Sequence, residues 1–310
     1  MKYEELLNDV KKYYQENNTS FSFLDDEKFK IANTYQMVHI SKGIVKAVWA
    51  LSYINTIHYA TFMSNLKPRT PFINPNKNPH IYETILSKRQ QIKTYFESSK
   101  ENLGLNGAPD IDPEPICETI NPSYQPHIQG KKYYITNKIC SYALFFLLLH
   151  EMAHNECDLK MPEKTEYGNT EYSDEEKRIS QEIEKQCDKI AFEKYNSEIL
   201  KKDTNSNNLA KIGLQIAMLF LIVKSFDQQS FDGDEHPESY KRIWDIMEPI
   251  CKDNDEAWSV LVSILSFEFK DITQIKINQR KTYDSFKDVV YDYLELIKKY
   301  DMENLKTTIS

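Results

Sequence analysis

Near the middle of the chain stands Leu147-Leu148-Leu149-His150-Glu151-Met152-Ala153-His154, a His-Glu-x-x-His motif that follows an apolar run. In a helix, His150 and His154 lie one turn apart on the same face. Two neutral imidazoles at that spacing can bind one Zn²⁺, and the intervening Glu151 can take a proton from a water on the metal. Residues 142–149 are all apolar or aromatic, which predicts a central helix. Burying two imidazoles and a carboxylate there costs free energy unless a cation or another partner compensates them.

A catalytic zinc usually has three protein ligands, so the motif needs a third. Residues 182–191 offer two glutamates, Glu182 and Glu184. At 100° per residue, Glu184 falls on the same arc as Cys187, whereas Glu182 falls near Lys189 on the charged side. The helical period therefore predicts Glu184 as the third metal ligand.

Further polar residues are expected around these ligands. Asp188 follows Glu184 by one turn, and we expect it to accept the free N–H of a ligand histidine, His150. A carbonyl under attack also needs a donor or a cation for its developing negative charge. His236 is the first candidate for that role, with Tyr240 and Arg242 as second choices. The alternative for His236 is a position at the start of a helix with no part in catalysis.

Composition favours a soluble cytoplasmic protein. The 310 residues carry a net charge of −8, which argues against bulk binding to nucleic acid or to anionic membranes. The longest apolar stretch, 212–223, is shorter than the ~20 residues of a membrane span. The N-terminus lacks the apolar segment of a signal peptide. The five cysteines contain no Cys-x-x-Cys pair, and we expect reduced thiols.

The pattern of apolar residues predicts a mainly α protein with a small β-sheet, an α+β fold. The segments expected to be helical are 2–16, 37–66, 81–99, 137–157, 173–195, 209–226, a helix opened by His236-Pro237, 255–269 and 283–300. Short strands are expected around 116–120 and at 132–136. The strand 132–136 leads directly into the histidine helix. It is either an edge where an extended peptide pairs or an ordinary strand of the sheet.

A proline-rich segment offers the best domain boundary. Residues 67–79 contain four prolines, which exclude a helix and indicate a connection. The predicted division is an N-terminal helical region, 1–70, and a metal-binding body, 71–310. The alternative is one continuous domain.

The motifs together resemble a known family. His150-Glu151-x-x-His154 with Glu184-x-x-x-Asp188 resembles the gluzincin pattern of metallopeptidases. The form Glu184-x-x-Cys187-Asp188-x-x-Ala191, followed by His236-Pro237-x-x-x-x-Arg242, resembles the Lit-type phage-exclusion peptidases. It is more distantly similar to the membrane-embedded CAAX-processing and HtpX-type enzymes. The resemblance covers about residues 132–242.

That resemblance implies a zincin-like core with an HExxH active-site helix. It implies a zinc endopeptidase that acts inside bacteria in phage defence by abortive infection. The expected substrate is then an intracellular protein, such as the translation elongation factor Tu, and a phage-encoded activator is an expected partner. The resemblance supports His150, Glu151, His154 and Glu184 as site residues and favours His236.

This sequence departs from the family pattern at one position. Cys187 stands where alanine is usual before the aspartate. Cysteine is small, so we expect the packing to be preserved. The alternative to a packing role is a redox-sensitive position close to the metal.

Two other functions remain open from the sequence. One is a soluble repressor-cleaving peptidase like ImmA/IrrE, although Asp188 stands where asparagine is expected and no helix-turn-helix is evident. The other is a non-enzymatic helical interaction protein with structural zinc. Such a closed site needs a fourth ligand, for which Cys157 and Asp158 are nearby, but it leaves Glu151 without a role.

Overall fold

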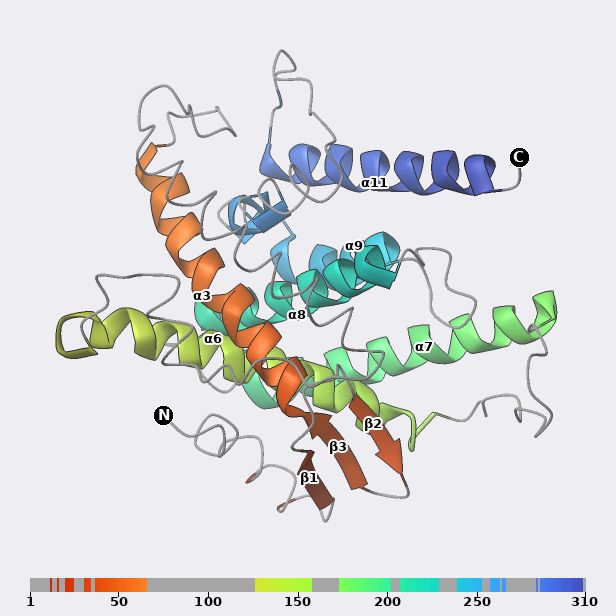
Figure 1. Ribbon diagram of the computed structural model, residues 1–310, viewed down its shortest axis with the longest axis horizontal. Coiled ribbons are helices and arrows are strands. Elements are labelled where there is room, and N and C mark those ends of the chain that lie inside the picture. Colours follow the sequence, from red (N-terminus) through yellow and green to blue (C-terminus); the bar gives the residue numbers. More distant parts are fainter. Residues whose placement is uncertain are drawn as a thin grey trace.

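The chain folds into layers of helices with one small sheet at their edge, in a computed structural model (Figure 1). The mainly α fold predicted from the sequence is confirmed. The structure describes residues 12, 16, 20–24, 31–34, 37–65, 126–157, 173–201, 207–228, 239–252, 257–262, 264–265, 283 and 285–308. The predicted connection at 67–79, the helices 2–16 and 81–99, and the strand 116–120 lie wholly or largely outside these residues.

Helix α6, Pro126–Ala153, carries His150 and Glu151 of the histidine motif and is the centre of the fold, and His154 lies in the turn directly after it. It packs against α8 (Asn207–Gln228), α7 (Asp174–Tyr195) and α3 (Lys42–Asn65). Every residue from 143 to 150 is buried, as expected of a helix surrounded by others.

The predicted strand at 132–136 is wrong, because these residues belong to the first half of α6. Burial at Thr136, Ile139, Cys140 and Ala143 follows the helical period and not the alternation of a strand. The suggested edge for pairing with an extended peptide is therefore absent from this segment. Proline at the first position of α6 suits a helix start, because its missing N–H has no partner there in any case.

A glycine allows α8 to lie close to α6. A Cβ atom added to Gly213 would be 2.5 Å from the Cβ of Tyr142 and 2.9 Å from the carbonyl oxygen of Ile139. Contacts that short cannot be relieved by a side-chain rotation, because one partner is backbone. The close approach of α8 helps to fix the helix from which the two histidines project.

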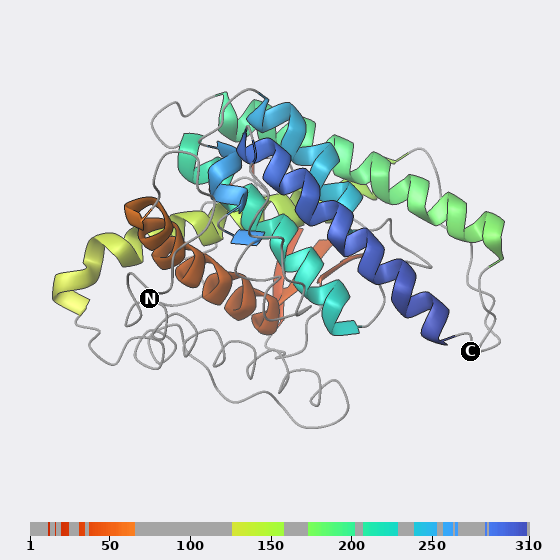
Figure 2. The same ribbon diagram turned by 90° about the horizontal axis from the view of Figure 1, so that it is seen from above.

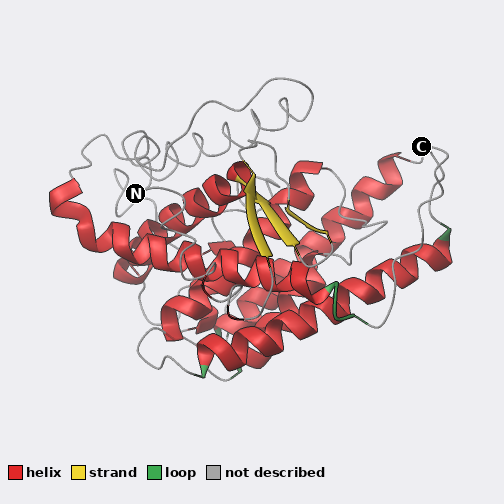
Figure 3. Cartoon of the chain, turned by 90° about the horizontal axis from the view of Figure 1, so that it is seen from below, coloured by secondary structure: helices red, strands yellow, loops and turns green. Residues whose placement is uncertain are grey.

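The sheet has three strands, β1 (Ser20–Leu24), β2 (Ile31–Thr34) and β3 (Met37–Ser41), in the order β1-β3-β2. The central strand β3 is parallel to β1 and antiparallel to β2. Its alternate residues Val38 and Ile40 are fully buried, and β2 and β3 contact α6. Figure 3 shows the sheet as a small unit beside the helices.

The sheet corrects the sequence prediction in two ways. The helix predicted from residue 37 begins at Lys42, directly after β3. The range 1–70, expected to be helical, also contains three strands. Helix α3 packs against α6 and α8, and the division of the chain into two domains stays a prediction.

The remaining helices complete the body. Helix α7 begins with a capping box formed by Ser173 and Glu176 and continues into the π-helical turn η1, Asn196–Leu200. Helix α9, Ser239–Cys251, packs against α8 and α7, and α11, Phe286–Thr308, packs against α9 (Figure 2). Helical residues 257–262 lie within the predicted segment 255–269.

Within the described ranges, no helix combines the length and the apolar character needed to cross a membrane. The four cysteines that the structure describes are free thiols. They are Cys140, Cys157, Cys187 and Cys251.

Candidate metal centre

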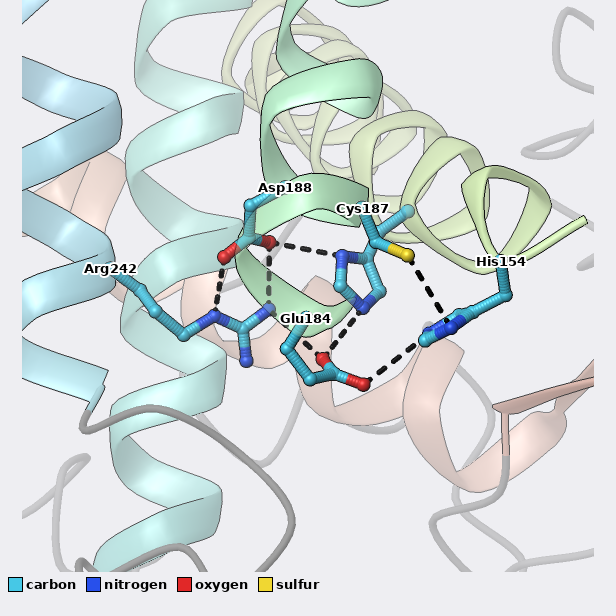
Figure 4. A network of polar contacts seen from close by, with 6 residues as sticks. His154, Glu184, Cys187, Asp188 and Arg242 are labelled. Carbon is cyan, nitrogen blue, oxygen red and sulfur yellow. Dashed lines mark hydrogen bonds and ion pairs between the residues drawn. The ribbon is translucent and has the colours of Figure 1, made fainter. Parts of the chain in front are cut away.

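Two histidines at the end of α6 meet a glutamate of α7 (Figure 4). His150 Nε2 lies 3.1 Å from Glu184 Oε2, and His154 Nε2 lies 3.4 Å from Glu184 Oε1. The two imidazole rings are 5.1 Å apart between centroids and perpendicular. One ligand atom from each of the three residues lies within 4.8 Å of the others. Two imidazole nitrogens and one carboxylate are the donor set of catalytic zinc sites, so these residues fit the ion that the sequence implies.

The helical period of α7 explains why Glu184 reaches the centre. Its buried face includes Ile183, Glu184, Cys187 and Asp188. The Glu184 side chain is only 2% exposed, whereas the side chain of Glu182 is 54% exposed. The prediction that Glu184 faces inward and Glu182 faces solvent is confirmed.

Asp188 lies behind His150, on the side away from Glu184. Its Oδ1 is 2.9 Å from His150 Nδ1, close enough to accept the ring N–H. When His150 is neutral, a carboxylate in this position selects the tautomer with the proton on Nδ1, which leaves the Nε2 lone pair directed at the centre. The structure therefore places Asp188 where the sequence predicted it.

Arg242 from α9 donates two hydrogen bonds to the carboxylate of Asp188. Its Nε donates to Asp188 Oδ2 over 2.7 Å and its Nη2 donates to Oδ1 over 2.8 Å. The guanidinium is buried, and Nη2 also lies 3.9 Å from Glu184 Oε2. Arg242 thus binds Asp188 behind His150, which argues against its predicted second-choice role as a donor to a reacting carbonyl. Tyr240, the other second choice, packs in the hydrophobic core.

The buried charges shift the pKa values of this network strongly. Burial alone would lower the pKa of His150, but the hydrogen bonds and charges of Asp188 and Glu184 outweigh it and raise that pKa to about 10. Burial alone would raise the pKa of Asp188, but Arg242 and His150 bring it down to about 2. These two carboxylates therefore favour the protonated form of His150 when no metal is bound. A cation bound at the centre would have to displace the proton on Nε2.

Cys187 lies beside the second histidine. Its Sγ is 3.4 Å from His154 Nδ1, on the ring edge that does not face Glu184. Burial raises the pKa of the Cys187 thiol well above its usual value, and neighbouring Glu184 raises it further. The thiol is therefore protonated at neutral pH, which argues against a reactive thiolate there. The role of Cys187 that the structure supports is a packing partner of His154.

The side chains of the centre differ in how far they are exposed to solvent. The side chain of Glu184 is buried and that of His150 nearly so, whereas that of His154 is 23% exposed. Glu151, next to His150 on α6, is half-buried. The centre therefore meets solvent on the side of His154. His236 and Asp158 lie outside the described residues, so the structure does not place them.

Sequence reasoning named Arg242 but missed its partner. The sequence does indicate that Arg242 needs a buried partner, because it lies among Ile243, Ile246 and Met247 on the buried side of an amphipathic helix. An arginine on such a face needs a buried carboxylate. Nothing in the local sequence identified Asp188 as that carboxylate, because the two residues are 54 positions apart.

Comparison with known proteins gives one match. The family model described as Peptidase U49 matches residues 38–261 of the chain. That range contains all but the first residue of β3, together with α3 and helices α6 to α9, and therefore every residue of the centre. No curated protein and no solved structure matches the chain.

Proposed function

The chain belongs to the peptidase U49 family, and from this premise we propose that it is a zinc-dependent endopeptidase with His150, His154 and Glu184 as metal ligands. The observation that carries the proposal is the convergence of the three ligand atoms within 4.8 Å of one another. The residues come from two separate helices, so their meeting is a property of the fold and not of a local repeat.

In this proposal, the protein's own residues have separate roles in peptide hydrolysis. A zinc ion bound there would act as a Lewis acid and lower the pKa of a water on it towards ~7. Glu151 accepts the proton of the attacking water and passes a proton to the leaving amine. Asp188 keeps the proton of His150 on Nδ1. We assign stabilisation of the developing oxyanion to His236, as the sequence pattern suggests.

The resemblance to the Lit type extends the proposal to a biological setting. We propose that the enzyme acts in the cytoplasm on an intracellular protein, a translation factor such as elongation factor Tu. Its role would be phage defence by abortive infection, with a phage-encoded activator as a partner. The zincin-like core and the body 71–310 belong to the same proposal. Helices α6 and α7, with the turn that follows α6, supply the three ligands and are the part of that core on which the proposal depends.

The structure weighs against a closed structural zinc site. A fourth protein ligand would have to reach the position that the two Nε2 atoms and Glu184 would leave open. The nearest thiol that the structure describes, Cys187, faces the opposite ring edge of His154. The thiol of Cys157 instead donates to Gln186 Oε1 over 3.2 Å. A repressor-cleaving peptidase would share the proposed centre and differ only in substrate.

Removal of the metal tests the proposal. Treatment of the purified protein with 1,10-phenanthroline should abolish cleavage of elongation factor Tu, because the three ligands alone cannot activate water. Addition of zinc after removal of the chelator should restore cleavage. The isomer 1,7-phenanthroline, which does not chelate, is the control and should have no effect. Undiminished cleavage by protein shown to contain no metal would refute a zinc-dependent mechanism.

A further inference from the structure

We propose that Arg242 is a positioning residue for the metal centre, acting through Asp188 on the imidazole of His150. This inference rests on the proposed function, because it assigns a role in binding the proposed ion. It concerns the layer of residues behind the ligands. The three helices α6, α7 and α9 each contribute one member of the relay.

The geometry forms a continuous relay of hydrogen-bond distances. Arg242 contacts both oxygens of Asp188, over 2.7 and 2.8 Å, and Asp188 Oδ1 lies 2.9 Å from His150 Nδ1. A carboxylate held by one partner can rotate about its last bond, whereas two parallel N–H···O bonds fix its plane. Fixing the plane of Asp188 fixes the direction from which it accepts the His150 proton. The ring orientation of His150, and hence the direction of its Nε2, is expected to follow from that contact.

The charge of Arg242 also suits the centre. Asp188 and Glu184 are both almost completely buried, and they flank the same imidazole. Two buried carboxylates repel each other when His150 is neutral, as a metal ligand must be. The Arg242 guanidinium lies against Asp188 and 3.9 Å from Glu184, so it offsets both negative charges. A lysine would supply the charge but not the planar fork.

The alternative role for Arg242 is general packing of α9 against α7. A packing role would affect folding but would not depend on Asp188 for its effect on metal affinity. The two roles are therefore separated by a double-mutant cycle read out on zinc affinity. The cycle comprises the wild-type protein, Arg242→Gln, Asp188→Asn and the double variant.

Zinc affinity of each full-length protein would be measured by competition with a chromophoric chelator, with circular dichroism as a check on folding. Arg242→Gln and Asp188→Asn should each lower zinc affinity by about 10- to 100-fold, the usual effect of losing an outer partner. The double variant should bind zinc within about 2-fold of Asp188→Asn alone, because Arg242 then has no carboxylate to orient. Arg242→Lys should restore only part of the loss. The control is Arg178→Gln, an exposed arginine at the start of α7, which should bind zinc like the wild type.

Each outcome decides between the possibilities. Wild-type affinity in Arg242→Gln, or multiplied losses in the double variant, would overturn the role of Arg242 and leave the metal centre intact. A wild-type protein that binds no zinc would overturn the proposed function itself. If Arg242→Gln does not fold because it leaves a buried carboxylate unpaired, Arg242→Lys, which keeps the charge but not the planar fork, takes its place as the single variant of the cycle. The double variant leaves no buried carboxylate unpaired, so its folding stability should not suffer from this effect.

Discussion

The Glu151→Gln protein will retain its zinc and lose peptidase activity, with kcat lower by roughly 10²- to 10⁴-fold, the usual contribution of a general base. Glutamine has nearly the same shape as glutamate but cannot accept the proton of the attacking water. Glu151 is not one of the three residues whose ligand atoms converge, so its replacement should leave the metal in place. The separation of the two effects is what distinguishes a catalytic centre from a structural one.

The measurement pairs zinc content by atomic emission with the rate of substrate cleavage. Glu156→Gln is the matched control, because Glu156 lies close by in sequence and forms an ion pair with Lys194 outside the centre. That variant should cleave at the wild-type rate. Full activity in Glu151→Gln would remove the proposed proton acceptor. Loss of zinc together with activity would show that Glu151 is needed to hold the metal.

The second large effect that we expect is a loss of zinc affinity when Glu184, the proposed ligand on α7, is replaced. Glu184→Ala should lower zinc affinity by at least about 100-fold, because loss of an outer partner already costs about 10- to 100-fold and Glu184 is proposed to contact the ion itself. Glu182→Ala removes the same side chain two residues earlier, from a position that is 54% exposed. Its zinc affinity should equal that of the wild type. Isothermal titration of the metal-free proteins would measure both.

An isosteric variant separates the loss of a metal ligand from a loss of folding in this comparison. Glu184→Gln preserves the volume of the side chain and removes its charge, so it should still show a clear loss of zinc affinity. Circular dichroism of each metal-free variant would show whether α7 is intact. If Glu182→Ala lost zinc and Glu184→Ala kept it, the assignment of the third ligand would be reversed.

The arrangement of α7 could be predicted from the sequence because one rule governs it. Residues three and four apart share a face of a helix, so the buried positions Cys187 and Ala191 placed Glu184 and Asp188 on the inner side. The rule needs no knowledge of the rest of the fold. The start of this helix at residue 173 was predicted on a similarly local basis, because Ser173 and Glu176 have the spacing of a capping box.

The start of α6 was misassigned because local preference and tertiary context disagree there. Residues 132–136 include two tyrosines, an isoleucine and a threonine, which favour strands when considered alone. In the structure they extend the histidine helix, and Thr136 and Ile139 are buried in its contacts. Packing against neighbouring helices outweighs the intrinsic preference of these residues for a strand.

A small sheet was predicted, but its strands were placed at other residues, for a different reason. Residues 20–24 alternate between serine and apolar side chains, which is a strand pattern, but the segment is too short to stand out. Residues 37–41 run without a break into α3, so the apolar pattern of the helix included Val38 and Ile40. The pairing of β1 with β3 joins residues 17 positions apart, as in Ser20 and Met37, and local sequence does not specify it.

The relay from Arg242 to His150 lay beyond prediction because it depends on how α9 lies against α7. Sequence spacing fixes which residues share a face within one helix, but not which faces meet. The two carboxylates of α7 and the arginine of α9 come together only in the folded chain. Contacts between distant helices are therefore the part of this site that the structure supplied.

The central claim is that His150, His154 and Glu184 bind one zinc ion, and X-ray absorption at the zinc edge of the loaded protein tests it most directly. The account predicts a first shell of nitrogen and oxygen only, at about 2.0–2.2 Å, with the outer-ring scattering of two imidazoles. The Glu184→Ala protein should lack this shell. A sulfur scatterer at about 2.3 Å, from Cys187 or Cys157, or a spectrum without imidazole scattering, would contradict the account.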